Sequence, residues 1–124
     1  MNPSLENEIN LLHSQICGAL ADPKRILILY TLSEQSMSVT EISQRLQIPQ
    51  PTVSRHLKTL RERGLVNAIR DGQSVYYSLA DRRVIDALDT LREVLADLLE
   101  SQRSLADSFS PSIANESESQ EGIE

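Results

Sequence analysis

Three cationic side chains lie close together on one predicted helix of a chain that is acidic as a whole. Arg55, Lys58 and Arg61 follow one another at intervals of three residues within residues 50–62. Guanidinium and ammonium groups bind phosphate, and an arginine can also read guanine through a pair of hydrogen bonds. The 124 residues carry a formal net charge of -6, so a positive helix needs an explanation. The simplest explanation is contact with nucleic-acid phosphate.

The charge of the chain is distributed unevenly. Residues 23–77 hold eight basic and four acidic side chains, which gives +4, whereas residues 1–22 carry -3 and residues 78–124 carry -7. The positive charge therefore gathers around the cationic helix. Because a phosphate group responds to the local field, the overall negative sign is a weak objection to nucleic-acid binding.

Capping residues predict where the helices that position these side chains begin. Pro3 and Pro23 each follow a residue with a capping side chain, and these two pairs predict two helix starts. Ser38 with Glu41 forms a capping-box pattern, which predicts a third helix. The run from Ile26 to Tyr30 is apolar almost all round, which predicts that the second helix is the buried centre.

The cationic helix itself is predicted over residues 50–62, after a turn over residues 47–51 that tucks Ile48 into the core. Val53, Leu57 and Leu60 share one face, which leaves the donors and cations on the other. Gly64 supplies the expected left-handed stop.

A hairpin and a last helix complete the predicted elements. Residues 65–70 and 74–79 are β-rich runs around Asp71-Gly72-Gln73, a strong hairpin signal. By alternation, Tyr77 should lie in the core and Tyr76 should face outward. Asp81 can cap the last helix.

Apolar residues recur at intervals of three and four along the first and last predicted helices. Such seams predict a dimer face. Its candidate residues are Leu5, Ile9, Leu12, Leu88, Leu91, Leu95 and Leu98.

Composition indicates one small domain over residues 1–105, followed by an acidic, Ser- and Glu-rich tail over residues 106–124 that we expect to be disordered. The single cysteine, Cys17, cannot form an intrachain disulfide and fits a reducing cytoplasm. We expect neither a signal peptide nor a membrane span.

Two short helices joined by a tight turn and followed by a hairpin indicate a mainly helical, winged helix-turn-helix fold. At this point the residues resemble the ArsR/SmtB family of dimeric bacterial repressors. The matching stretches are ALADPKRILIL (19–29), SVTEIS (38–43), PTVSRHLKTLRERGLV (51–66) and DGQSVYYSL (71–79). The resemblance implies four helices, two strands and a final helix, with the first and last helices making the dimer interface.

The candidate DNA-binding residues come from the cationic helix and the wing. Arg55 is the best candidate for reading guanine, Lys58 would contact phosphate, and His56 has either a buried or a phosphate-bonding role. The full set is Gln50, Thr52, Ser54, Arg55, His56, Lys58, Thr59, Arg70 and Gln73.

A possible sensor is the pair His13 and Cys17, four residues apart on one helix face. The thiol can be a small buried hydrophobe, a thiol redox or persulfide sensor, or, with His13, half of a metal site shared across a dimer. The metal sites familiar in the family lack their ligands here. Residues 37–40 hold no cysteine pair, and the last helix offers acids without histidine, so we assign no metal and no cofactor.

The sequence thus predicts a homodimeric, cytoplasmic transcriptional regulator, a repressor that binds double-stranded DNA at an imperfect palindrome and is released by an inducer whose identity the sequence leaves open. The alternative is a winged-helix dimer that has no specific affinity for DNA and serves as a protein-interaction module. An enzyme is not expected, because no phosphate loop or nucleophile pair is present.

Overall fold

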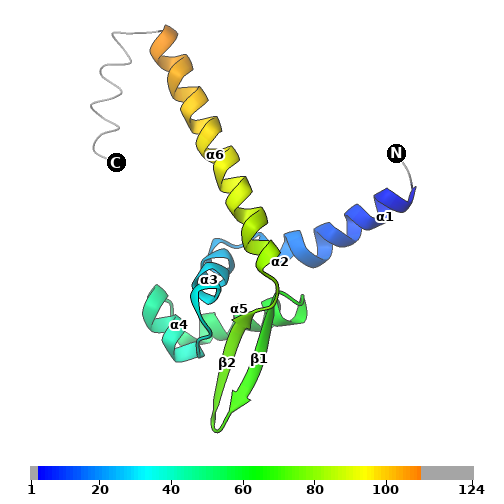
Figure 1. Ribbon diagram of the computed structural model, residues 1–124, viewed down its shortest axis with the longest axis vertical. Helices are drawn as coiled ribbons and strands as arrows, with labels where there is room; N and C mark the ends of the chain where they lie inside the picture. The colour runs from blue at the N-terminus through cyan, green and yellow to red at the C-terminus, as the bar shows by residue number, and fades with distance from the viewer. Residues whose placement is uncertain (1–2, 110–124) are drawn as a thin grey trace. The chain divides into compact units, whose positions relative to one another are not determined.

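A computed structural model describes residues 3–109 (Figure 1). The elements are α1 (Pro3–Leu12), the π-helix η1 (His13–Cys17), α2 (Gly18–Leu20), α3 (Pro23–Glu34), α4 (Val39–Leu46), α5 (Gln50–Glu62), β1 (Val66–Asp71), β2 (Ser74–Leu79) and α6 (Arg82–Phe109). By its contacts the chain divides into a unit up to Ile85 and a second unit from Asp86 onward. This order of elements confirms the predicted winged helix-turn-helix plan.

The first predicted helix is interrupted by a π-helical turn. Leu12 and Gly18, which flank η1, both have right-handed helical backbone angles, and the Gly18 N–H donates to the His13 carbonyl. The backbone therefore stays helical from α1 into α2, with one wider turn between them. Two carbonyl groups of the π-helix accept hydrogen bonds from a distant part of the chain, because the Arg63 side chain donates to the Ser14 and Gln15 carbonyls.

Helix α3 begins as predicted and forms the centre of the core. The Asp22 carboxylate accepts a hydrogen bond from the Lys24 backbone N–H at 2.9 Å, which caps the helix. Ile28 and Leu29 are fully buried, whereas Leu27 is half exposed. Ile26 and Tyr30 are half-buried, so the predicted buried centre is confirmed at Ile28 and Leu29 and is wrong at Leu27.

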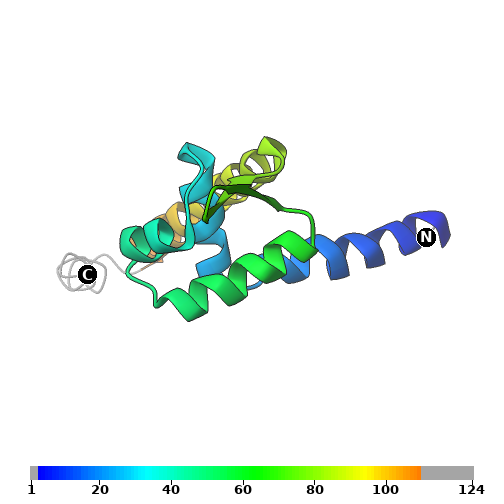
Figure 2. The same cartoon turned by 90° about the horizontal axis from the view of Figure 1, so that it is seen from below.

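Helices α4 and α5 make the helix-turn-helix. The capping box between Ser38 and Glu41 is formed in both directions, and α4 ends where Gln47 turns left-handed at φ 56°. Ile48 then packs into the core. Helix α5 has the predicted bounds, and Gly64 follows it at φ 81°. Figure 2 shows α4 beside the N-terminal end of α5.

The wing is a two-stranded antiparallel hairpin. Asp71 pairs with Ser74, so the loop is Gly72-Gln73, and Gly72 has the positive φ that such a loop requires. Tyr77 is held to the start of the helix-turn-helix by two backbone hydrogen bonds with Met37. Both wing tyrosines are half-buried, so the predicted division into an inner Tyr77 and an outer Tyr76 is wrong.

Helix α6 begins directly after Asp81, whose carboxylate caps the helix as predicted. Arg83 binds the Asp81 carboxylate through its side chain and its backbone N–H, which lowers the pKa of that carboxyl to about 2. The helix reaches Phe109, so the first four residues of the stretch predicted as a tail are helical. The remainder, residues 110–124, lies outside the described residues.

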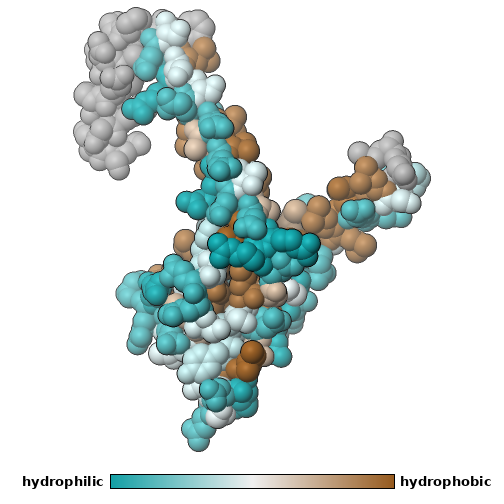
Figure 3. Space-filling model, viewed as in Figure 1, coloured by the Kyte–Doolittle hydropathy of each residue, from teal (hydrophilic) through white to brown (hydrophobic). Residues whose placement is uncertain are grey.

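Apolar side chains remain exposed along both helices that were predicted to form a dimer face (Figure 3). Of the predicted interface residues, only Leu88 is buried within the chain itself, at 7% exposure. The other six residues are between 43% and 61% exposed. None of the described helices is both long and apolar enough to cross a membrane.

Loss of the capping box should destabilise the helix-turn-helix. The Ser38→Ala variant removes the acceptor for the Glu41 backbone N–H and should lower the free energy of unfolding by about 1 kcal/mol. Urea denaturation followed by circular dichroism measures this change. The matched control is Ser36→Ala, an exposed residue just before the box, and an equal loss in both variants would contradict the capping role.

Candidate nucleic-acid interface

Helix α5 is divided into a fully buried face and an open polar face. Val53, Leu57 and Leu60 are 0% exposed. The opposite side carries Arg55 and Lys58, both exposed. Since the apolar face packs toward α3, α4 and β1, the helix cannot rotate without burying charge. The fold therefore fixes the cations on the outside.

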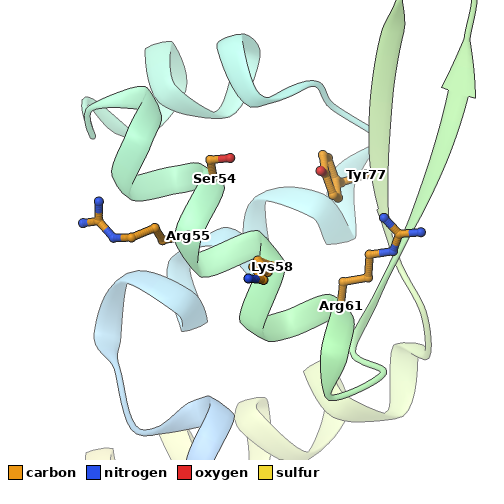
Figure 4. A pocket seen from close by; sticks show the side chains of 5 residues that line it. All are labelled: Ser54, Arg55, Lys58, Arg61 and Tyr77. Carbon is orange, nitrogen blue, oxygen red and sulfur yellow. The ribbon is translucent and has the colours of Figure 1, made fainter.

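The open face of α5 borders a hollow that extends to the wing. Its volume is about 250 Å³, and it is lined by Ser54, Arg55, Lys58, Arg61 and Tyr77 (Figure 4). Figure 4 shows Arg61 reaching toward the strands, whereas Arg55 extends from the helix in the opposite direction. Within the described residues neither Lys58 nor Arg61 has an acidic partner, so both cations are available to an anion.

The other predicted residues of α5 are placed as follows. Gln50 and Ser54 are exposed, and Thr52 and Thr59 are half-buried. The Thr52 hydroxyl accepts a hydrogen bond of 3.3 Å from Arg55, which holds the guanidinium near the first turn of the helix. On the wing, Arg70 and Gln73 are exposed on either side of the hairpin tip. The structure thus brings the helical residues onto one side of α5, with His56 as the exception.

His56 lies toward α3 instead of the open face. Its side chain is only 14% exposed, and its Nε2 is 3.9 Å from Asp22 Oδ2. Arg25 Nη1 lies 3.4 Å from the other ring nitrogen, and Arg25 also donates to the Ala19 and Gly18 carbonyls. The contacts of His56 therefore favour the buried role over the phosphate-bonding role.

The charge state of His56 follows from these neighbours. A guanidinium group can only donate hydrogen bonds, so Nδ1 of the histidine accepts and the ring proton sits on Nε2, toward Asp22. Burial lowers the pKa of His56 and outweighs the opposing effect of the Asp22 carboxylate. The imidazole is therefore neutral at pH 7, and it joins α5 to the start of α3.

Two residues of the hollow were not among the predicted DNA-binding set. Arg61 continues the row from Ser54 and Lys58 at intervals of four and three residues, a spacing that places all three on one side of a helix. That signal was present in the sequence. Tyr77 carries no such signal, because its place beside α5 depends on the pairing of β2 with Met37.

The candidate sensor residues His13 and Cys17 lie at the two ends of the π-helical turn, and both are exposed. The interpretation of Cys17 as a small buried hydrophobe is therefore wrong for this chain. Within the described part of the chain, no three His, Cys, Asp or Glu side chains gather in a way that could hold a metal ion. A redox or metal role for the pair remains a prediction.

Residues 22–68 match a family model described as "Bacterial regulatory protein, arsR family". A curated relative, the HTH-type transcriptional repressor SmtB of Mycobacterium tuberculosis, is 42% identical over 78 residues, which cover 60% of this chain and 58% of SmtB. The uncharacterized HTH-type transcriptional regulator MJ1325 of Methanocaldococcus jannaschii is 38% identical over 82 residues, covering 65% of this chain and 92% of MJ1325. The match therefore spans less than two thirds of SmtB but nearly all of MJ1325.

A solved structure shares this fold. It is the homodimeric winged helix-turn-helix DNA-binding domain of Mb0332 from Mycobacterium bovis, described as a possible ArsR-family transcriptional regulator. The TM-score is 0.68 at 26% identity, over 82% of this chain and 93% of that domain.

Protonation of His56 should destabilise the fold. Because the folded chain lowers the pKa of this imidazole, the unfolded chain binds more protons below about pH 6.5, and stability should fall as the pH drops through that region. The slope cannot exceed about 1.4 kcal/mol per pH unit for one proton. Urea denaturation between pH 5 and pH 7.5 measures it. His56→Gln should flatten the slope, and the matched variant of the exposed His13, His13→Gln, should not; equal slopes in wild type and His56→Gln would contradict this account.

Proposed function

The chain belongs to the arsR family of bacterial regulatory proteins, and from that premise we propose that it is a homodimeric DNA-binding repressor of the cytoplasm. As a member of a family of transcriptional regulators it is not an enzyme. The observation that carries the proposal is the open face of α5, where cations and hydroxyl groups are exposed directly opposite a fully buried apolar face.

In the proposed complex the first turns of α5 enter the major groove. Arg55 reads guanine through two hydrogen bonds, and Gln50 and Ser54 reach neighbouring base edges or phosphates. Lys58 contacts a phosphate as a point charge. Arg70 and Gln73 on the wing touch the DNA beside the groove. The exposure of all six residues on α5 and the hairpin tip supports these roles.

The proposed dimer forms through α1 and α6. Leu5, Ile9 and Leu12 on α1 are 43–45% exposed, and Leu91, Leu95 and Leu98 on α6 are 54–61% exposed. Burial of apolar surface contributes about 25 cal/mol of stability for every Å² removed from water. A second copy of the chain that covered these leucines would therefore stabilise both helices. The homodimeric state described for the Mb0332 domain supports this arrangement.

A two-fold dimer predicts the form of the operator. Two symmetry-related α5 helices read an imperfect palindrome with half-sites about 34 Å apart, one helical turn, or a multiple of it. Repression follows because the dimer occupies the operator. An inducer that altered the spacing of the two helices by a few ångströms would remove groove contacts in one half-site and release the DNA.

The alternative function is a protein-interaction module. The salt dependence of DNA affinity distinguishes it from the proposed DNA-binding repressor. A DNA reader loses affinity for its own promoter steeply with salt, with a slope of about 0.9 for each phosphate neutralised. An interaction module would bind promoter and random DNA equally weakly.

Removal of either α5 cation should weaken DNA binding. Arg55→Ala should cost about 1–3 kcal/mol and relax the preference for one base pair per half-site, because a paired contact to guanine is lost. Lys58→Ala should weaken binding to every sequence and lower the salt slope by about 0.9 per protomer. Fluorescence anisotropy with a promoter fragment measures both effects. The matched control is Arg103→Ala on α6, which should bind as wild type does; unchanged binding in the α5 variants would contradict the proposal.

A charge placed in the exposed seam of α6 should produce monomers. Leu95→Glu puts a carboxylate where a leucine would be buried between subunits, and its desolvation opposes association. Sedimentation velocity should report a mass near 13.9 kDa for this variant and about twice that for the wild type. Ile69→Glu is the control, since this wing residue is 62% exposed and lies outside the seam. A dimeric Leu95→Glu variant would exclude α6 from the interface.

A further inference from the structure

The hollow between α5 and β2 has the composition of an anion site. Of the five residues that line it, three are cationic (Arg55, Lys58 and Arg61) and two carry hydroxyl groups (Ser54 and Tyr77). All five can donate hydrogen bonds, and none is an acid. We propose that this hollow seats one phosphate of the DNA backbone, with Lys58, Arg61 and Tyr77 as its ligands. The inference rests on the proposed function and adds a defined phosphate contact to it.

Two other surface hollows among the described residues have a different composition. One is lined by Gln35, Met37, Glu41, Gln44 and Arg45, and its arginine is already paired with Glu34 at 3.0 Å. The other is lined by Asp89, Arg92, Glu93 and Ala96. Each of these two contains a carboxylate, which repels an anion. In the α5–β2 hollow, by contrast, Lys58 and Arg61 have no acidic partner among the described residues.

The two sides of the hollow are held in place before any ligand binds. Helix α5 is fixed by its buried apolar face. The tyrosine side is fixed by the bridge between Tyr77 and Met37, whose N–H···O distances are 2.8 and 3.0 Å, and Met37 is itself buried. Figure 4 shows Tyr77 projecting from its strand and Arg61 reaching from the helix toward the strands. Donors from a helix and from the wing therefore face one space on backbones that are already fixed, and a ligand would have to order only the side chains.

Such a contact would set the position of the protein on DNA without reading the sequence. Phosphate contacts fix register and orientation, whereas base edges carry specificity. A phosphate bound between α5 and β2 touches the groove-reading helix and the wing at once. It would thereby hold Arg55 and the hairpin tip at a constant distance along the duplex.

The test uses the dimeric, full-length protein and a promoter fragment. In Arg61→Ala, affinity at low salt should fall about tenfold for promoter and random DNA alike, and the salt slope should fall by about 0.9 per protomer. Tyr77→Phe keeps the ring and the backbone bridge and loses only the hydroxyl, so affinity should fall about fivefold. Arg103→Ala is the matched arginine control and should change neither quantity.

Neutral methylphosphonate linkages, introduced one at a time into the promoter fragment, locate the contact. One linkage in each half-site should weaken binding by the wild type and weaken binding by Arg61→Ala less, because the variant has lost one of the three ligands of that phosphate and keeps Lys58 and Tyr77. A merely structural role of Arg61 would weaken binding and leave the effect of every single linkage as large as in the wild type. That outcome, or an unchanged salt slope in Arg61→Ala, would overturn the inference.

Two further outcomes keep this inference separate from the proposed function. If the wild type binds its promoter no more tightly than random DNA, the proposed function is wrong, and the inference that rests on it is wrong with it. If inorganic phosphate, titrated calorimetrically without DNA, binds the wild type at micromolar concentration and binding is lost in Arg61→Ala, the hollow serves a soluble anion and the assignment to DNA is wrong. Binding of promoter DNA with a single sensitive linkage, together with only weak binding of free phosphate, is the expected result.

Discussion

The one-sided burial of α5 is the constraint on which the rest of the structure depends. Val53, Leu57 and Leu60 are completely removed from water, and each buried leucine or valine contributes about 1.5–3 kcal/mol. Rotation of the helix by half a turn would exchange these side chains for Arg55 and Lys58, whose burial without partners is far more costly. The same packing that stabilises the core therefore determines which side chains meet a ligand. In the proposed complex, folding and DNA recognition use opposite faces of one helix.

Arginine and histidine side chains connect this helix to the start of the chain. Arg63, directly after α5, donates to carbonyl groups of the π-helical turn, and Gln15 from that turn donates back to the Arg63 carbonyl at 3.2 Å. His56 and Arg25 make a second link near the start of α3. Single π-helical turns within α-helices occur frequently at functional sites. In the proposed dimer built through α1, these contacts would join the interface helix to the helix that we propose reads DNA.

Local signals in the sequence predicted the elements well, and long-range packing accounts for what they missed. The capping box at Ser38 and the stop at Gly64 depend on residues within one turn, so both were visible in the sequence. The π-helical turn and the exposure of Cys17 depend on what the rest of the chain packs against each residue. Likewise the hollow depends on Tyr77, whose position is set by pairing with Met37, forty residues away.

The central claim is that the open face of α5 sits on DNA. The most direct test is a titration of nitrogen-15-labelled protein with its promoter duplex, followed through backbone amide resonances. The account predicts that the largest shifts fall in residues 50–61 and 70–73, with small changes along the acidic helix α6. Shifts confined to α6, with α5 unchanged at saturating DNA, would contradict it.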